Sequence, residues 1–378
     1  MKKIAVIGST GSIGVQTLNV IRRYPDKFKV VSLAAGKNTA LFSEQVKEFR
    51  PKIATVAQEF DGIKELDKIS EIFVGENAFT NAITADADLV VISLVGFTGI
   101  IAVLDAIGKG KDIALANKES LVVGGDIVMK KAREKGLKIL PIDSEHSAIW
   151  QALNFDFNAP FNRIILTASG GAFRDKTAEE LKNVTAADAL KHPNWAMGAK
   201  ITVDCATLVN KAFEVIEAKW LYSAPFDKID VIIHRESIIH SLIEYPDGSI
   251  IGQMGYPTME LPIQIAIGYP ERLSPVTESL NFAKIGTLTF SEPDYKRFPA
   301  FSEVVAAGKK GGAYPAVANG ANDAAVKLFL KNKIGFNDIY GAISGALNAY
   351  NGEYHGDFET LKAANDFAAR FVKEKFGV

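Results

Sequence analysis

Two carboxylates, Asp143 and Glu145, stand two positions apart after a short apolar run that ends at Ile142. On an extended backbone, residues two apart point to the same side, so the pattern predicts two carboxylates together at the end of a strand. Their oxygens suit Mg²⁺ and Mn²⁺, which are hard, octahedral ions. The pair is a weak signal by itself, and a third carboxylate has to come from elsewhere in the chain.

A helix that begins near Thr207 offers that carboxylate. Asn210 and Lys211 precede Glu214 by four and three positions, which places the three side chains on one helix face. An amide, an ammonium and a carboxylate on one turn could hold a phosphorylated substrate beside a metal ion. From the spacing alone, however, a solvated helix face is the better interpretation.

A glycine-rich segment near the start of the chain has the position of a nucleotide-binding loop. Residues 8–14 (GSTGSIG) join an apolar run at 4–7 to an amphipathic stretch at 13–23. Glycines there let a phosphate approach the backbone, and the helix N-terminus supplies free N–H groups. The spacing is GxxGxxG rather than the commoner GxGxxG, so a tight turn without a ligand is the alternative.

The second apolar run, residues 30–35, leads into Gly36, Lys37 and Asn38. NAD-binding domains usually carry an acidic residue there, which binds the ribose 2′-hydroxyl. This sequence has no carboxylate at that place, and a lysine beside an asparagine suits the 2′-phosphate of NADP(H). The alternative for Lys37 is an ordinary solvated lysine.

Two further segments have the composition of substrate loops. An apolar run at 164–168 opens into Ser169 and two glycines, whose free N–H groups could form an anion-binding nest, although an ordinary turn explains them equally well. Residues 192–198 (HPNWAMG) carry a tryptophan on a predicted loop. Such a residue often covers a ligand and excludes water, with core packing as the alternative.

The elements that must position these residues fall into three regions. Short apolar runs alternate with helix-like stretches through residues 1–142, which predicts a Rossmann-like, doubly wound parallel sheet. Residues 143–268 hold four of the five histidines and all three tryptophans, which chance and core packing could also explain. We expect an α+β catalytic domain there, with strands at 230–239 and 249–254. Residues 269–292 have the character of a linker. Residues 293–378 carry the patterns of a C-terminal helical bundle, with helices at 322–330, 336–349 and 358–371.

The composition excludes several classes of protein. Forty-three basic and 44 acidic residues leave a formal net charge of −1, so no bulk charge favours nucleic acid or an anionic membrane. No apolar run approaches the roughly 20 residues of a membrane-spanning helix, and the first one ends at Gly8, too early for a signal peptide. The single cysteine, Cys205, excludes an intrachain disulfide and fits a reducing compartment, so we expect a cytoplasmic protein.

Seven segments together resemble the 1-deoxy-D-xylulose 5-phosphate reductoisomerases of the non-mevalonate isoprenoid pathway. They occur in the family's order, and the combination of LANKE, DSEH and HPNW is far more specific than any single piece. The later sequence matches in general pattern. The segments are GSTGSIG (8–14), AGKN (35–38), LANKESLV (115–122), PIDSEH (141–146), ASGG (168–171), HPNW (192–195) and residues 201–217.

The resemblance implies an N-terminal NADPH domain, a central catalytic domain and a C-terminal helical bundle in a homodimer. It also implies NADPH and Mg²⁺ or Mn²⁺, with Co²⁺ as a further candidate, and a phosphorylated ketose as substrate. In the implied reaction, the metal ion polarises the ketone as a Lewis acid. The skeleton then rearranges by retro-aldol cleavage and re-addition, and NADPH reduces the aldehyde to give 2-C-methyl-D-erythritol 4-phosphate.

The resemblance assigns roles residue by residue. The positions that match cofactor contacts are Thr10, Gly11, Ser12, Ile13, Gly36, Lys37, Asn38, Asn117, Glu119 and Gly198. The positions that match metal ligands are Asp143, Glu145 and Glu214. The positions that match substrate contacts are Lys118, Ser144, Glu145, Ser169, His192, Cys205, Asn210, Lys211 and Glu214. The resemblance assigns catalytic roles to Lys118, Glu145, His234 and Trp195, with Lys118 and Glu145 as the candidates for proton transfer. Trp195 and Met197 match a mobile loop at about 190–200 that closes over the site.

This sequence departs from the family's pattern at several positions. Cys205 stands where a phosphate-binding serine is common, Arg235 and Glu236 stand where proline and glutamine are usual, Ala172 replaces a frequent proline and Ala199 a frequent basic residue. Two alternative functions stay open. An NADP-dependent semialdehyde dehydrogenase would need Cys205 as its nucleophile, and a non-catalytic NADP(H)-binding regulator would show no metal-dependent turnover.

Overall fold

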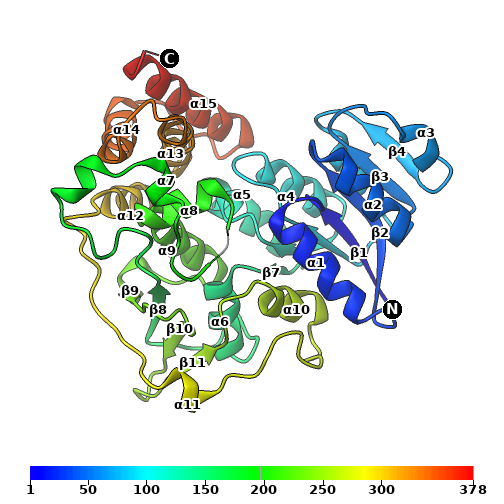
Figure 1. Ribbon diagram of the computed structural model, residues 1–378, viewed down its shortest axis with the longest axis horizontal. Coiled ribbons are helices and arrows are strands. Elements are labelled where there is room, and N and C mark those ends of the chain that lie inside the picture. The colour runs from blue at the N-terminus through cyan, green and yellow to red at the C-terminus, as the bar shows by residue number, and fades with distance from the viewer. Residues whose placement is uncertain (196, 378) are drawn as a thin grey trace. The chain divides into compact units, whose positions relative to one another are not determined.

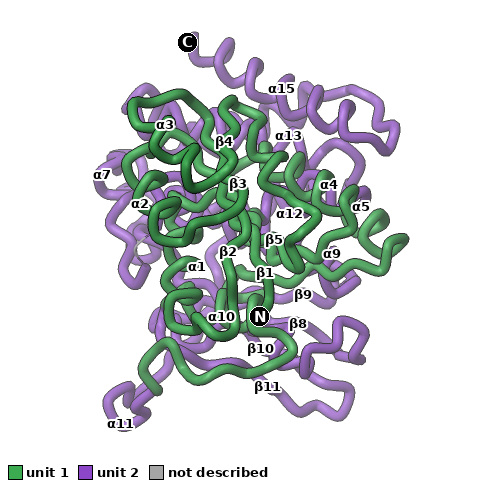
Figure 2. Tube along the Cα trace, turned by 90° about the vertical axis from the view of Figure 1, so that its right-hand side faces the viewer, with its two compact units in different colours: residues 1–117, 128–147, 258–279 green, residues 118–127, 148–257, 280–378 purple. Residues whose placement is uncertain are grey.

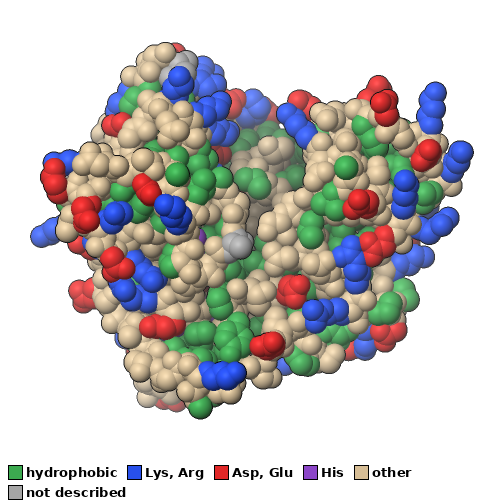
Figure 3. All heavy atoms as spheres, in the orientation of Figure 1, with side chains coloured by type: hydrophobic (Ala, Val, Ile, Leu, Met, Phe, Trp, Pro, Cys, Tyr) green, Lys and Arg blue, Asp and Glu red, His purple; other side chains and the backbone are tan. Residues whose placement is uncertain are grey.

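The computed structural model describes residues 1–195 and 197–377 (Figure 1). Acidic and basic side chains are mixed over the face drawn in Figure 3, as the near-zero net charge predicts. Within the described part of the chain, no helix combines the length and the apolar character needed to cross a membrane. The chain forms two compact units (Figure 2): residues 1–117, 128–147 and 258–279 make the first, and residues 118–127, 148–257 and 280–378 make the second.

The first unit is built on a seven-stranded parallel sheet in the order β4-β3-β2-β1-β5-β6-β7. The predicted doubly wound sheet is therefore confirmed. Its strand order reverses between β1 and β5, which is where open α/β sheets bind nucleotides. The strands are β1 (Lys2–Ile7), β2 (Phe28–Ala35), β3 (Ile53–Val56), β4 (Glu71–Val74), β5 (Leu89–Ile92), β6 (Asp112–Leu115) and β7 (Ile139–Pro141).

Helices connect these parallel strands because each connection must carry the chain from the end of one strand back to the start of the next. The last four residues of β1 and all four residues of β5 are buried, so these segments form continuous apolar runs in the sequence. The helices of this part of the chain are α1 (Ser12–Arg23), α2 (Thr39–Phe49), α3 (Ile63–Leu66), α4 (Gly99–Gly108), α5 (Glu119–Glu134) and α6 (Ser144–Ala152), with a 3₁₀ turn at Ala78–Ala82. The division between the units falls within α5 and α6.

Residues 258–279 belong to the first unit, although the sequence analysis divided them between the catalytic domain and the linker. Their helix, α10 (Glu260–Gly268), packs against α1. Gln264 donates a hydrogen bond to the hydroxyl of Tyr24 (2.8 Å), and Lys2 Nζ donates to the carbonyl of Ile267 (2.9 Å). Contacts between residues so distant in sequence leave no local pattern from which this placement could be predicted.

The second unit contains a four-stranded mixed sheet in the order β11-β10-β8-β9. Strands β8 and β9 are parallel, and β10 and β11 continue the sheet in antiparallel fashion. The predicted strand at 230–239 is wrong in its length, because the chain turns at His234 and the next strand begins at Ile239. The strands are β8 (Arg163–Ala168), β9 (Ile229–Ile233), β10 (Ile239–Glu244) and β11 (Ile250–Met254).

The remaining helices of the second unit include the predicted C-terminal bundle, in which α13 packs against both α14 and α15. Helix α14 has the predicted bounds, whereas α13 begins earlier than predicted because Pro315 is well suited to a first helical turn. The helices are α7 (Ala186–Ala189), α8 (Ala199–Ala206), α9 (Val209–Leu221), α11 (Phe282–Ile285), α12 (Ala300–Lys310), α13 (Tyr314–Leu330), α14 (Phe336–Ala349) and α15 (Phe358–Lys375), with 3₁₀ turns at Glu180–Asn183 and Phe226–Lys228.

Candidate active site

The carboxylates Asp143 and Glu145 come together by a geometry different from the one predicted. Strand β7 ends at Pro141 and α6 begins at Ser144, so the backbone is not extended between the two residues. Asp143 instead caps the helix, because its Oδ1 accepts a hydrogen bond from the backbone N–H of Glu145 (3.2 Å). The extended-strand explanation is therefore wrong, although the two side chains are neighbours.

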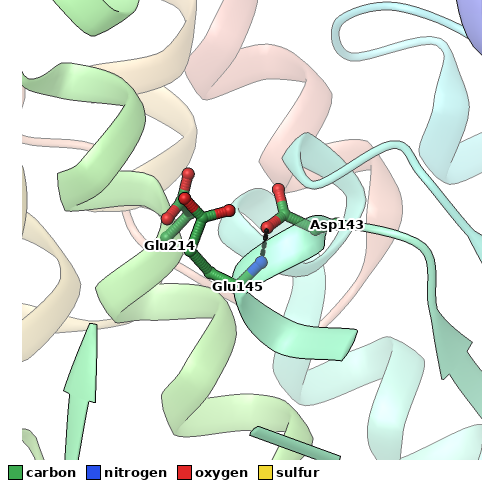
Figure 4. A group of neighbouring side chains, drawn as sticks. All are labelled: Asp143, Glu145 and Glu214. Carbon is green, nitrogen blue, oxygen red and sulfur yellow. Dashed lines mark hydrogen bonds between the residues drawn. The ribbon is translucent and has the colours of Figure 1, made fainter. Parts of the chain in front are cut away.

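Asp143, Glu145 and Glu214 offer carboxylate oxygens that all lie within 4.8 Å of one another (Figure 4). Asp143 and Glu214 are buried and Glu145 is half-buried, so three negative charges share a poorly hydrated space. Such a group is unfavourable unless cations balance it. An all-oxygen set of this kind suits Mg²⁺ or Mn²⁺, with the remaining coordination positions left for water or substrate.

Glu214 also contacts two lysines and an amide. Lys118 Nζ lies 3.0 Å from Glu214 Oε1, Lys211 forms an ion pair with Oε2, and Asn210 Nδ2 donates to Oε1 (2.6 Å). Lys211 is 4% exposed and Glu214 1% exposed. The interpretation of this helix face as a solvated one is therefore wrong. Two ammonium groups beside a carboxylate cluster can bind an anionic substrate next to a metal ion.

A second group of polar side chains surrounds the end of β8. Ser169 Oγ lies 3.0 Å from His192 Nε2 and accepts a hydrogen bond from the backbone N–H of Gly171 (3.2 Å). Arg174, which no motif in the sequence indicates, donates to the carbonyl of Ser169 (2.9 Å). The structure thus gathers a hydroxyl, an imidazole and a guanidinium around one loop, which is a suitable environment for a phosphate.

The hydrogen bonds of His192 select one neutral tautomer of its ring. Its Nδ1 accepts hydrogen bonds from the backbone N–H groups of Asn194 (3.2 Å) and Trp195 (3.0 Å), so the proton of the neutral ring is on Nε2. Burial, assisted by the charge of Arg174, lowers the pKa of His192 to about 4. In the free protein near neutral pH, His192 is therefore a neutral hydrogen-bond donor toward Ser169.

Cys205 lies on α8 and is half-buried. Burial raises the pKa of its thiol well above the ordinary range, and the neighbouring lysines do not reverse that shift. A nucleophilic cysteine needs a depressed pKa or an adjacent base. The semialdehyde dehydrogenase alternative, which depends on an activated Cys205, has no support in this geometry.

The geometry of His234 does not suit proton transfer. The side chain is completely buried, and its Nε2 accepts from the backbone N–H groups of Ile238 and Ile239 (both 3.1 Å). Its Nδ1 lies 3.0 Å from the carbonyl of Thr289 and 3.1 Å from Glu236. Both ring nitrogens are thus committed to neighbouring protein groups. The ring stabilises the turn between β9 and β10, and Glu236, one of the departures from the family's pattern, joins that network.

Trp195 is half-buried, and its ring meets the buried ring of His240 edge-on, with centroids 6.0 Å apart. Met197 is half-buried as well, whereas Ala196, which completes the predicted loop, lies outside the described residues. In this conformation Trp195 is neither free in solvent nor deep in the core. The position allows the side chain to cover a ligand.

The glycine loop of the first unit has the geometry of a phosphate-binding turn. Gly8 has a φ of +96°, and a Cβ on Gly14 would lie 2.2 Å from the carbonyl oxygen of Gly8. Gly11 precedes α1 without a side-chain cap, and Gly11 and Ser12 are exposed, so the first N–H groups of α1 face solvent. The loop therefore keeps its backbone open to an anion. Thr10 and Ile13, the other predicted cofactor residues of this loop, are half-buried.

The remaining predicted cofactor residues occur in both units. Gly36, Lys37 and Asn38 are exposed after β2, and Asn38 caps α2 by accepting a hydrogen bond from the backbone N–H of Leu41 (3.3 Å). Asn117 is buried, and its amide donates to the carbonyls of Leu94 (2.9 Å) and Gly96 (3.0 Å). Gly198 is the N-cap of α8 and Glu119 is the first residue of α5.

The comparisons with known proteins agree along the whole chain. Family models described as 1-deoxy-D-xylulose 5-phosphate reductoisomerase match residues 4–125, and models of the C-terminal domains of the same enzyme match residues 139–222 and 254–371. The reductoisomerase of Gloeobacter violaceus is 46% identical over 99% of this chain and 97% of its own length. This chain belongs to the 1-deoxy-D-xylulose 5-phosphate reductoisomerase family. A second member, from Exiguobacterium sibiricum, is 48% identical over 98% of each chain.

Solved structures of reductoisomerases have the same fold as this chain. The enzyme from Zymomonas mobilis, in complex with NADPH, superposes with a TM-score of 0.92 at 38% identity and covers 99% of each chain. A reductoisomerase in complex with NADPH, fosmidomycin and magnesium superposes with a TM-score of 0.94 at 34% identity, covering all of this chain and 98% of its own. The fold expected from the resemblance is thus confirmed.

Proposed function

We propose that this reductoisomerase family member converts 1-deoxy-D-xylulose 5-phosphate into 2-C-methyl-D-erythritol 4-phosphate, with NADPH as reductant and Mg²⁺ or Mn²⁺ as metal ion. The observation that most strongly supports this proposal is the cluster of Asp143, Glu145 and Glu214, whose carboxylate oxygens lie within 4.8 Å of one another. One solved relative in complex with NADPH, and a second in complex with NADPH, fosmidomycin and magnesium, support the same cofactors here.

The three carboxylates would hold the metal ion, which supplies Lewis-acid polarisation of a carbonyl when it is bound. Lys118 and Glu145 are the candidates for moving protons at the substrate hydroxyls. Lys118 lies 3.0 Å from Glu214, beside the ligand cluster, and Ser144 donates to Glu145 (2.6 Å), which orients that carboxylate. His234 acts as a positioning residue, because both of its ring nitrogens are engaged by protein groups.

The phosphate of the substrate would be bound by neutral and cationic donors. Ser169 and His192 provide neutral groups at the end of β8, while Asn210 and Lys211 provide an amide and an ammonium from α9. Cys205 would lie at the same subsite and contribute only a weak thiol donor. Trp195 would cover the bound substrate and exclude water from the reacting carbons.

NADPH would bind at the carboxyl edge of the first unit's sheet. The pyrophosphate would face Thr10, Gly11, Ser12 and Ile13, where the α1 N-terminus is open. The adenosine 2′-phosphate would meet Gly36, Lys37 and Asn38. Asn117, Glu119 and Gly198 would complete the cofactor site.

We also propose that the protein is a cytoplasmic homodimer with the three functional regions expected from its sequence. The single cysteine is in keeping with a reducing compartment.

The evidence for a dimer comes from strand β11. It is an edge strand of the second unit's sheet, and its Ile250 and Ile251 are about half exposed (51% and 49%). An exposed apolar edge strand favours pairing with another chain. Sedimentation equilibrium should give twice the mass of the chain, and a monomer at micromolar concentration would contradict the dimer.

The activity is tested by mixing the protein with NADPH, Mn²⁺ or Mg²⁺, and 1-deoxy-D-xylulose 5-phosphate. We expect the absorbance of reduced nicotinamide to fall only when all components are present, and methylerythritol phosphate to form in equal amount. Controls lack the metal ion, which is removed by a chelator, or the substrate. Tight NADPH binding without any metal-dependent turnover would instead support the non-catalytic regulator.

A further inference from the structure

Lys200 is the common partner of three carboxylates that come from three different helices of the second unit. Its Nζ lies 2.9 Å from Glu119 on α5, 3.0 Å from Asp204 on α8 and 3.1 Å from Asp323 on α13. The lysine side chain is only 20% exposed, and the three carboxylates are 9%, 3% and 18% exposed. This group lies outside the metal and phosphate sites, and Lys200, Asp204 and Asp323 have no role in the function proposed above.

Lys200 is linked to the proposed cofactor site in two ways, by its contact with Glu119 and by its place in the first turn of α8. Glu119 is a predicted cofactor contact and the first residue of α5. Gly198, another predicted cofactor contact, is the N-cap of α8, two residues before Lys200. Thr202, in the first turn of α8, donates its hydroxyl to the carbonyl of Gly198 (2.9 Å). One ammonium therefore fixes a side chain on one helix and the start of another helix.

The opposite side of the network is anchored in the C-terminal bundle. Asp204 Oδ1 accepts a hydrogen bond from Asn322 Nδ2 (2.8 Å), and Asn322 and Asp323 are adjacent on α13. Asp204 and Asn322 are both buried. Breaking a buried network of this kind is more disruptive than breaking a surface pair, because the remaining charges cannot be solvated.

The charge of Lys200 also controls the state of Glu119. Burial by itself would raise the pKa of Glu119, but the charge of Lys200 and its hydrogen bond hold that pKa below its ordinary value. An ionised carboxylate is a pure hydrogen-bond acceptor, suited to the hydroxyl or amide donors of a nucleotide. Without a cation beside it, a carboxylate this deeply buried would favour protonation.

We propose that Lys200 is a positioning residue for the cofactor, which holds Glu119 and the Gly198 turn in their NADPH-binding arrangement by linking α5 and α8 to α13. The inference rests on the assignment of Glu119 and Gly198 to NADPH in the proposed function. It adds a role for the C-terminal bundle, whose helix α13 supports the cofactor site through Asp323 and Asn322.

The test measures the Kd for NADPH, by nicotinamide fluorescence, in Lys200→Met, Lys200→Arg and the matched control Lys182→Met. Lys182 forms an exposed ion pair with Glu179 in the same unit. We expect Lys200→Met to raise the Kd at least tenfold, which corresponds to about 1.4 kcal/mol. Lys200→Arg should recover most of the affinity, because it keeps the charge, and Lys182→Met should leave the Kd unchanged. In the assay, the KM for NADPH should rise while the KM for the phosphorylated ketose changes little.

Two additional variants distinguish a loss of NADPH affinity from a failure to fold and from an incorrect assignment of Glu119. If Lys200→Met does not fold, Lys200→Met/Asp323→Asn removes one carboxylate together with the cation and should show the same loss of affinity. Glu119→Gln separates the proposal from its premise: an unchanged Kd in that variant would show that Glu119 does not bind NADPH. If Glu119→Gln weakens NADPH and the folded Lys200 variants do not, the role of Lys200 is overturned while the proposed function stands.

Discussion

The two units place their charged groups in different surroundings. In the first unit the buried parts of strands β1 and β5 are apolar, and the predicted cofactor residues Gly11, Ser12 and Lys37 are exposed beyond the ends of strands. In the second unit, helices α8 and α9 bury charged side chains, with Asp204 at 2% and Lys211 at 4% exposure. These exposed cofactor residues of the first unit can therefore be exchanged with little effect on stability, whereas on α8 and α9 function and stability depend on the same groups.

The largest effect on stability is expected for Lys211→Met. Lys211 and Glu214 form an ion pair three residues apart on α9, and their side chains are 5% and 1% exposed. Removing one partner of a buried pair typically destabilises a protein by about 3–5 kcal/mol. Denaturant unfolding of the ligand-free protein measures the change.

The control for this prediction is Lys182→Met, because Lys182 and Glu179 have the same spacing but are 59% and 78% exposed. Removing a surface pair changes stability by less than about 1 kcal/mol. An equal loss of unfolding free energy in the two variants, or a gain in stability for Lys211→Met, would contradict the claim that buried charges stabilise the second unit.

The next largest effect is a change of cofactor preference without a change of stability. Lys37→Ala should weaken NADPH far more than NADH, because only NADPH carries the 2′-phosphate. A charge-assisted contact contributes about 1.5–3 kcal/mol, so the preference should fall roughly tenfold or more. Binding of both cofactors is measured together with the unfolding free energy, and Lys29→Ala, an exposed lysine on β2, is the control. An unchanged ratio of affinities would make Lys37 an ordinary surface lysine.

A smaller effect is expected at Cys205. Cys205→Ser replaces a weak thiol donor with a hydroxyl at the proposed phosphate subsite, and one added hydrogen bond contributes about 0.5–1.5 kcal/mol. The KM for the phosphorylated ketose should fall accordingly, while kcat changes little because the phosphate lies away from the reacting carbons. Cys205→Ala, which adds no donor, should not lower the KM. A collapse of kcat in the serine variant would restore the nucleophile hypothesis.

The smallest effect is a spectroscopic one at Trp195. If the side chain covers the substrate, ligand binding should quench or shift its fluorescence, because the ring leaves its contact with His240 or becomes further buried. Trp150 and Trp220 contribute a background, so the response is compared with that of Trp195→Phe. The same ligand response in both proteins would refute the covering role.

Local patterns in the sequence were sufficient for elements that bury an apolar face, in both units. The strand, glycine loop and helix at residues 2–23 follow from apolar runs and from Gly8 and Gly14, where a Cβ would clash with the backbone. Helix α14 was predicted with its observed bounds, since its apolar face is periodic. The periodicity of apolar residues indicates which side of a helix or strand faces the core. It predicts these elements because each of them buries an apolar face.

The buried charges could not be predicted in this way. Lys200 looks like a solvated lysine in the sequence, because its partners Glu119 and Asp323 are distant along the chain. Lys211 lies only three residues from Glu214, but that spacing alone favours a solvated helix face. The spacing of Lys200 and Asp204, four residues apart on α8, was the one local signal for that network. Asp143 and Glu145 were identified correctly as neighbours, but from an extended backbone that the structure replaces with a helix cap.

The central claim, that Asp143, Glu145 and Glu214 bind the catalytic metal ion, is tested most directly by titrating Asp143→Asn with Mn²⁺ in the turnover assay. Asparagine also caps helices well, so the substitution removes the charge and keeps the cap of α6. Asp357→Asn, at the exposed cap of α15, is the matched control. We predict that Asp143→Asn loses at least about 100-fold in turnover, since a metal ion supplies several kcal/mol of transition-state stabilisation. It should bind NADPH normally, and the control should be fully active. Near-normal turnover of Asp143→Asn at ordinary metal concentration would contradict the assignment.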